Sequence, residues 1–293
     1  MGVDFASRRI EKDTWVISGA GCDSYLLCGD DEAIMIDSGM SAANIREFAE
    51  TLTERPVRRV INTHSHFDHT AGNGHFEEIL CTKAASKSAK NTMGGDPNLY
   101  PLDYEFTFVS DKQVVDIGKR PLEIIELNCH SPGDIVILDK SRGFLFCGDE
   151  IESRSSLLLP GYSEKPGQIH AAPAGAVETF LNAMKKVKGY ESSFEQLCPA
   201  HNGSPMDRCY VDWYIELAQM IIEGFQGSDC CESLSYTRDM MHFPYPGAGY
   251  RRASHKGASL VYNENLILEG DRSRAESLPP ATPLHIIASY YIR

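Results

Sequence analysis

The sequence predicts an α+β protein in which β-sheets lie in the middle and helices pack against them. Short apolar segments rich in β-branched residues recur along the first half of the chain and indicate strands. Two longer segments, residues 172–188 and the stretch after residue 204, show the apolar spacing of helices. The order of strands, one helix, more strands and then helices is typical of layered α+β folds.

The first part of the chain is expected to form strands around one helix. Residues 41–54 carry Ile45, Phe48 and Leu52 at helical spacing, and Ser41 stands where it can cap this helix. The sequence GDDE forms the expected turn before the third strand. The predicted strands are residues 14–18, 24–28, 33–37 and 58–62.

A second series of strands is expected from residue 104 onwards. The sequence KSRG joins residues 134–139 and 144–149 as a hairpin. Near the end of the chain, residues 259–263 and 266–269 are expected to pair as another hairpin. The other predicted strands are residues 104–109, 112–117, 122–128, 195–200 and 284–292.

Helices are expected at four places after the first strands. Two short ones are predicted at residues 74–80 and 83–93, and a longer one at residues 172–188. Ser204 predicts the cap of the last helix, and Pro205 its first helical position.

The composition changes near residue 228. The stretch HFPYPGAGYRRASHKGA is rich in proline and glycine, unlike the chain before it. Residues 1–227 are therefore expected to form the main domain, and residues 228–293 a C-terminal appendage. This extension is expected to act as a lid, as part of a substrate pocket or as a contact in a homo-oligomer.

Composition and charge argue against several classes of protein. The 28 Lys and Arg against 41 Asp and Glu give a net charge of −13, which disfavours nucleic-acid binding. The nine cysteines show no C-x-x-C spacing and are odd in number, so reduced thiols are expected. No apolar run is long enough for a membrane span and no signal peptide is recognised. We therefore expect a cytoplasmic protein with no membrane or nucleic-acid partner.

The segment NTHSHFDHTAGN, residues 62–73, is rich in side chains that bind metals. His64 and His66 are two residues apart, so continuation of the preceding strand would direct both rings to one side. Asp68 and His69 follow where the chain has to bend back. The two pairs are expected to serve two metal ions. Neutral imidazole and carboxylate suit zinc, and also iron or manganese.

Three further candidates end apolar strands and begin loops that carry glycine. They are His130, Asp149 and His201. A rigid sheet can bring such strand ends to a common edge. His130 is expected to join the first histidine pair, and His201 to join Asp68 and His69. Asp149 can bridge the two groups, because a carboxylate has two oxygens.

Four motifs, THSHFDHTAGN, CHSPGD, FCGDE and PAHNG, resemble those of the metallo-β-lactamase superfamily and its glyoxalase-II-like hydrolases. The resemblance extends from residue 14 to residue 205 and fills all seven ligand positions of the family. It implies a four-layer αβ/βα sandwich with a dimetal site at one edge of two facing sheets. Residues 1–227 would be the hydrolase domain, and the resemblance does not cover residues 228–293.

Two positions of the first motif differ from other branches of that superfamily. His66 stands where the flavodiiron oxygen reductases have Glu, which argues against oxygen reduction. His69 stands where the main class of β-lactamases lacks a histidine, which argues against an antibiotic substrate.

The expected function is a dinuclear metal-dependent hydrolase, with two Zn²⁺ ions, that acts on a small ester, thioester or lactone. Two cations would leave a metal-bridging hydroxide near neutral pH, and this hydroxide would attack the carbonyl carbon. Asp68 is expected to bind metal and to orient the nucleophile or carry its proton. The alternatives are phosphodiester or amide hydrolysis, persulfide-dioxygenase-like chemistry at one iron, and metal binding without catalysis.

Several polar residues outside the motifs are candidates for supporting roles. The candidate substrate contacts, in the loop after the strand at 144–149, are Tyr162, Lys165 and His170. The candidate hydrogen-bond partners of the imidazoles are Asp37, Ser131 and Asp134. The pair Arg251 and Arg252 would hold an anionic substrate group or, as we favour, form surface ion pairs or an oligomer contact.

Overall fold

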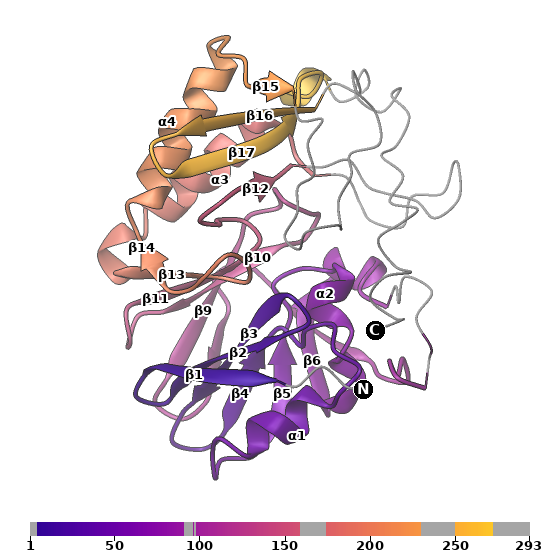
Figure 1. Ribbon diagram of the computed structural model, residues 1–293. Helices are drawn as coiled ribbons and strands as arrows, with labels where there is room; N and C mark the ends of the chain where they lie inside the picture. The colour runs from indigo at the N-terminus through magenta and orange to yellow at the C-terminus, as the bar shows by residue number, and fades with distance from the viewer. Residues whose placement is uncertain (1–4, 91–95, 97, 159–173, 230–249, 272–293) are drawn as a thin grey trace.

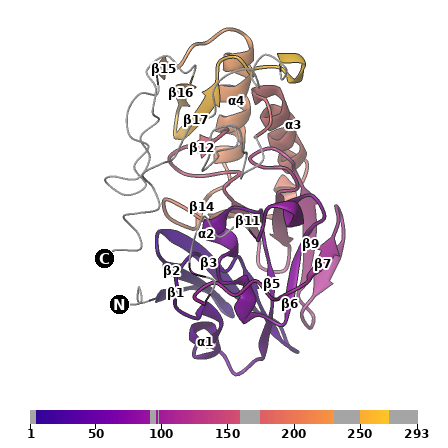
Figure 2. The ribbon, with the colours of Figure 1, turned by 90° about the vertical axis from the view of Figure 1, so that its right-hand side faces the viewer.

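Two β-sheets face each other across a shared apolar core, and helices cover their outer faces (Figures 1 and 2). The computed structural model describes residues 5–90, 96, 98–158, 174–229 and 250–271. Leu27 and Ile36 of the first sheet meet Ile124 and Phe146 of the second in the core. The layers run helix, sheet, sheet and helix, as the predicted αβ/βα sandwich requires.

The first sheet has seven strands in the order of the chain. The strands β1 to β4 are antiparallel, and β4 to β7 are parallel. Helix α1 (Ile45–Glu50) covers its outer face, where Ala49 packs in one cluster with Met35 and Val60. The strands are β1 (Ala6–Glu11), β2 (Thr14–Gly19), β3 (Cys22–Cys28), β4 (Ala33–Ile36), β5 (Val57–Ile61), β6 (Glu78–Thr82) and β7 (Phe106–Val109).

The second sheet has six strands in the order β14-β13-β11-β10-β9-β8. Both faces are covered, so β10 and β11 are buried at every position. Helices α3 (Val177–Lys188) and α4 (Tyr210–Ile222) pack on its outer face (Figure 1). The strands are β8 (Val114–Asp116), β9 (Pro121–Glu126), β10 (Ile135–Asp139), β11 (Phe144–Gly148), β13 (Gln196–Pro199) and β14 (Met206–Asp207). Within the described residues, no helix has the length and apolar character to cross a membrane.

A small third sheet lies beside α4, with its strands in the order β12-β17-β16-β15 (Figure 1). Ala253, Leu260 and Tyr262 belong to the same apolar core as the two long helices. The boundary near residue 228 stays a prediction. The strands are β12 (Ser156–Leu157), β15 (Ser228–Asp229), β16 (Tyr250–His255) and β17 (Ala258–Asn263). The short helical turns are α2 (Phe67–Thr70), η1 (Asn73–His75), η2 (Ala85–Lys87), η3 (Glu191–Ser193) and η4 (Glu269–Asp271).

The two short helices predicted after the first motif are wrong. Residues 78–82 form β6, which pairs in parallel with β5 and β7. An apolar run this short fits a helix or a buried strand equally well, and the pairing partners decide between them. Of the helix expected at residues 83–93, the described part contains only the single turn η2.

Two predicted helix starts are also wrong. Asn44 caps α1, because its side chain accepts from the Glu47 backbone N–H, while Ser41 Oγ accepts from Ala43 one turn earlier. The peptide bond before Pro205 is cis and leads into β14, so α4 starts only at residue 210. Serine is common both at helix N-caps and in turns, so the residue type alone did not show which of the two Ser41 and Ser204 would form.

The hairpin predicted between residues 259–263 and 266–269 is wrong, because the first of these segments pairs with another strand. β17 pairs with β16, not with residues 266–269. The sequence YRRASH of β16 carries charged and polar residues and gave no alternating apolar signal. The strand predicted at residues 284–292 lies outside the described residues.

Candidate metal centre

All seven predicted ligand residues lie together where strands of the two sheets end. Parallel strand ends and adjacent loops meet at one edge, which explains how residues far apart in sequence converge. The group that follows β5 is His64, His66, Asp68 and His69, and the later residues are His130 after β9, Asp149 after β11 and His201 after β13.

Three ring nitrogens converge in the first group of donors. His66 Nδ1 lies 3.0 Å from His64 Nε2 and 3.0 Å from His130 Nε2. Asp149 Oδ2 lies 3.8 Å from His64 Nε2 and 3.6 Å from His130 Nε2. These three nitrogens and one carboxylate oxygen are a donor set that suits a divalent cation.

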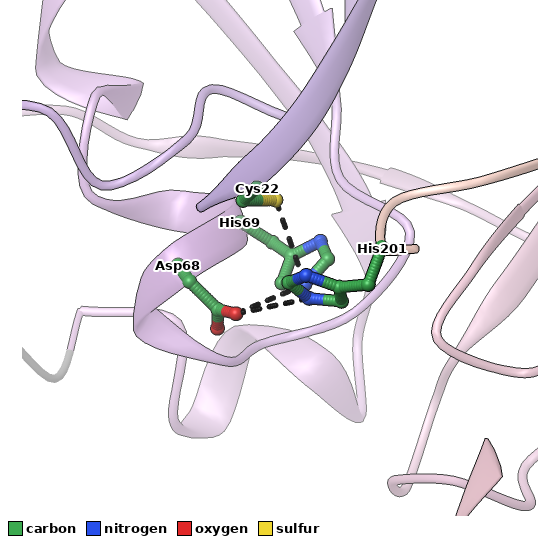
Figure 3. A group of neighbouring side chains, drawn as sticks. All are labelled: Cys22, Asp68, His69 and His201. Carbon is green, nitrogen blue, oxygen red and sulfur yellow. Dashed lines mark hydrogen bonds and ion pairs between the residues drawn. The ribbon is translucent and has the colours of Figure 1, made fainter. Parts of the chain in front are cut away.

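The second group combines two imidazoles with two carboxylates. Asp68 Oδ2 lies 3.2 Å from His201 Nε2 and 3.6 Å from His69 Nε2 (Figure 3). Asp149 Oδ1 lies 3.2 Å from His69 Nε2 and 3.3 Å from His201 Nε2. Asp149 therefore turns one oxygen to each group of donors.

The Asp149 oxygen in the second group has no hydrogen bond of acceptable geometry, although both rings lie close to it. Without a cation, the two rings alone have to balance the charge of this buried carboxylate. A cation between Asp149 and the rings would balance this charge directly. This observation supports a metal in the second group as well as in the first.

Backbone carbonyls set the tautomers of two distant histidines. His130 Nδ1 lies 2.9 Å from Leu157 O, and His201 Nδ1 lies 3.0 Å from Gly21 O. Because a carbonyl oxygen only accepts, each Nδ1 carries a proton, and each Nε2 is the nitrogen left to face the donor group. Both rings therefore present the correct nitrogen to a metal.

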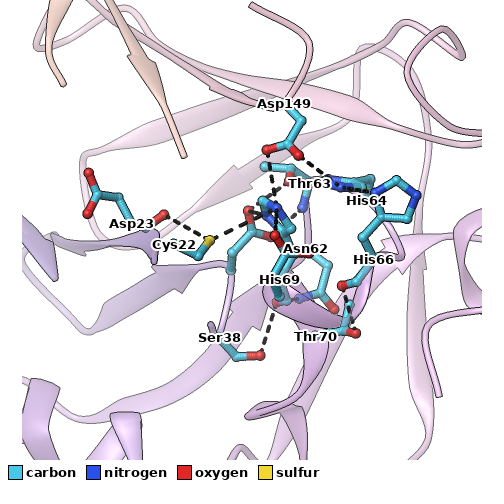
Figure 4. Close-up of polar contacts among 12 residues, drawn as sticks. Cys22, Asp23, Ser38, Asn62, Thr63, His64, His66, His69, Thr70 and Asp149 are labelled. Carbon is cyan, nitrogen blue, oxygen red and sulfur yellow. Dashed lines mark hydrogen bonds and ion pairs between the residues drawn. The ribbon is translucent and has the colours of Figure 1, made fainter. Parts of the chain in front are cut away.

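The Asp37 carboxylate fixes the first motif through three hydrogen bonds. It accepts from Thr63 N at 2.7 Å, from Thr63 Oγ1 at 2.7 Å and from His69 Nδ1 at 2.8 Å. Since Thr63 Oγ1 donates to Asp37, it accepts from His64 Nδ1 at 3.0 Å (Figure 4 shows Thr63 and His64). One carboxylate thus orients a ring in each donor group.

The other two residues expected to contact the imidazoles, Asp134 and Ser131, do not hydrogen-bond to the rings. Asp134 accepts from the N–H groups of Cys129 and Ser131 and so shapes the loop that carries His130. The Ser131 hydroxyl is buried and has no hydrogen-bond partner. That expectation was wrong in detail, because the His130 ring instead uses the carbonyl of Leu157.

Replacing Asp37 by asparagine should weaken metal binding without unfolding the protein. The amide cannot accept all three hydrogen bonds, so the His69 ring loses its fixed tautomer. We expect a loss of about 10–100-fold in metal affinity. Competition with a coloured chelator measures this loss, and an affinity equal to that of the wild type would contradict it.

Lowered pKa values keep two histidine rings of the first group neutral, as a metal ligand requires. Burial, together with the rings of His69 and His66, lowers the pKa of His64 well below its ordinary value. Burial and His130 lower the pKa of His66 to about 3. Both rings are therefore neutral near neutral pH, with lone pairs available.

The second group carries opposite charges. Burial disfavours the charged forms of these carboxylates and imidazoles. The attraction between the negative carboxylates and the positive rings outweighs this effect of burial on their pKa values. His69 and His201 hold the pKa of Asp68 well below its usual range, and Asp149 raises the pKa of His201 well above its own. The rings take up protons when nothing else neutralises the carboxylates, so metal binding there releases protons.

Three predicted substrate contacts, Tyr162, Lys165 and His170, lie outside the described residues. Arg251 Nε pairs with Glu264 at 2.7 Å, which agrees with the favoured structural role for Arg251, and for Arg252 that role stays a prediction.

One residue at the site was not predicted. Cys22 lies beside Asp68, His69 and His201, and its Sγ lies 4.0 Å from His69 Nε2 (Figure 3). Burial raises the pKa of its thiol, and the nearby His69 opposes this. No local pattern around Cys22 indicated a ligand. The available signal was its place at the turn between two expected strands.

The comparison with protein families settles the family. A model described as the metallo-beta-lactamase superfamily matches residues 17–221. The chain belongs to the metallo-β-lactamase superfamily. The predicted glyoxalase-II-like branch is supported by two relatives with hydrolase names.

The sequence relatives of this superfamily member are distant. The acyl-coenzyme A thioesterase MBLAC2 of Homo sapiens is 24% identical over 179 residues, which cover 50% of this chain and 64% of that protein. A hydroxyacylglutathione hydrolase of Rhodospirillum rubrum is 35% identical over 97 residues, which cover 33% of this chain and 35% of that protein. The chain therefore spans less than two thirds of the length of either relative.

Solved structures share the fold. A metallo-beta-lactamase from Pontibacter korlensis superimposes with a TM-score of 0.55 at 17% identity and covers 74% of this chain and 99% of its own. At this identity, the likeness concerns the fold alone, and the chemistry has to be argued from the site.

Proposed function

We propose that the protein is a dinuclear metal-dependent hydrolase of small thioesters, esters or lactones. The observation that carries this proposal is the geometry of Asp149, whose Oδ2 faces one donor group and whose Oδ1 faces the other. A carboxylate shared in this way is suited to joining two cations. Two zinc ions are the proposed pair, because imidazole and carboxylate donors both suit zinc.

Two divalent cations held by these residues would supply hydroxide near neutral pH, because such cations lower the pKa of bound water. The side chains of the protein would orient the attacking water. Asp68 is the more open of the two carboxylates, with 28% of its side chain exposed against 9% for Asp149. We therefore assign to Asp68 a second role, in which it orients the attacking water or accepts its proton.

The relatives favour thioesters over the other candidate substrates. Two proteins that this chain resembles have names that denote thioester or acylglutathione hydrolysis. The net charge of −13 also favours a small-molecule substrate over a nucleic acid.

A panel of substrates combined with metal analysis tests this proposal. We expect two zinc ions per chain and turnover of an acyl thioester, with slower or no turnover of phosphodiesters and amides. Chelation should abolish turnover, and added zinc should restore it. One iron per chain with oxygen consumption would overturn the proposal, as would a full metal load with no hydrolysis of any ester, thioester or lactone.

A further inference from the structure

Cys22 adds a thiol to the second group of donors. The ligand atoms of Cys22, Asp68, His69 and His201 all lie within 4.8 Å of one another. The side chain of Cys22 is 2% exposed. A thiol in this position faces imidazoles and a carboxylate, which are unusual neighbours for a residue that only fills space.

Most of the other buried cysteines have apolar surroundings. Cys28, Cys129, Cys147 and Cys198 each belong to one of the three apolar core clusters, whereas Cys22 and Cys81 belong to none of them. Of these two, Cys22 is the one whose sulfur lies in a group of metal-binding side chains.

The β2–β3 hairpin is tied to the loop that carries His201. Gly21 O accepts from His201 Nδ1 at 3.0 Å, and Asp23 N donates to Ala200 O at 2.8 Å. These two bonds flank Cys22 on both sides. The backbone of Cys22 is thus held beside the second donor group on both sides of the residue.

Cys22 would be a fifth protein donor at the second position. The nearest contacts between the carboxylates and the rings there are 3.2 Å for Asp68 to His201 and 3.2 Å for Asp149 to His69. Cys22 Sγ follows at 4.0 Å from His69 Nε2. Catalytic zinc sites can expand from four ligands to five, which leaves room for this thiol.

We infer that Cys22 is a thiolate ligand of the metal position formed by Asp68, His69 and His201. The inference rests on the proposed second metal position. As the sulfur–metal bond forms, the S–H bond breaks and the proton passes to the solvent, with no change of oxidation state. A thiolate favours zinc over manganese, because soft ligands select soft ions. Cys22 therefore makes the second position selective for zinc.

Cobalt substitution tests this inference in the full chain. Cobalt(II) bound by a thiolate gives a sulfur-to-metal charge-transfer band in the near ultraviolet, which nitrogen and oxygen ligands do not give. We expect the band in the wild type and its loss in Cys22→Ser. The preference for zinc over manganese should also fall about 10–100-fold or more in this variant. Cys28→Ser is the matched control, since Cys28 ends the same strand, and it should keep both properties.

The outcomes separate this inference from the proposed function. Two metal ions per chain without a charge-transfer band, or a band that persists in Cys22→Ser, would overturn the thiolate ligand and leave the dinuclear site in place. One metal ion per chain and no band would overturn both. If Cys22→Ser does not fold, alkylation of the wild type replaces it. Bound zinc should protect Cys22 from iodoacetamide, and equal labelling with and without zinc would contradict the inference.

Discussion

Asp149→Ala should lose bound metal and hydrolytic activity together. Removing the carboxylate takes one donor from each group, so both positions lose affinity. We expect the metal affinity to fall by more than about 100-fold, which exceeds the usual effect of a residue that only supports a ligand. Metal content after dialysis and turnover of an acyl thioester measure the two losses.

The neighbouring Glu150 cannot take over this role. Burial and the adjacent Asp134 raise its pKa well above the ordinary value, which disfavours the ionised form that a metal ligand needs. Its Oε1 also accepts from His130 N at 2.6 Å. Asp30→Ala is the control, because Asp30 is exposed and pairs only at the surface with Lys119. Full activity in Asp149→Ala would refute the shared carboxylate.

Arg120→Met should destabilise the whole fold. Arg120 is 2% exposed and forms an ion pair at 2.7 Å with Asp139, which is fully buried. The guanidinium also donates to Asp13 O, Cys28 O and Thr14 Oγ1, and so joins the two sheets. Removing it leaves Asp139 as an unpaired buried charge. We expect the free energy of unfolding to fall by about 3–5 kcal/mol.

Urea unfolding followed by circular dichroism measures this change. Lys119→Met is the matched control, since Lys119 is the adjacent residue and its ion pair with Asp30 is exposed. The control should leave the unfolding midpoint unchanged. In the double variant Arg120→Met with Asp139→Leu, no unpaired charge remains, and much of the stability should return. A single variant as stable as the wild type would refute this account.

The sequence was sufficient for the fold class and for seven candidate metal ligands that the structure brings together. Polar residues such as His130 and Asp149 follow apolar strands directly, and this local contrast can be read without knowing which strands pair. The spacing of His64 and His66 likewise places two rings on one side of an extended chain. The four-layer architecture came from the order of motifs that resemble a known family.

Assignments that depend on strand pairing failed more often. Residues 78–82 were predicted as part of a helix and form β6, because β5 and β7 lie on either side of them. β16 was not recognised, since its sequence is polar and its pairing with β17 alone makes it a strand. A short segment carries too little pattern to fix its own state.

The sequence by itself indicated the seven candidate ligands at the centre, because His130, Asp149 and His201 follow strands and the other four lie in one motif after β5. Only the tertiary structure decided how they are held. Nothing local to His201 or Cys22 indicates that the hairpin at Gly21 fixes both. Nor does any local pattern assign one oxygen of Asp149 to each donor group. These relations depend on the register and spacing of chain segments that are distant in sequence, and packing of the two sheets sets that spacing.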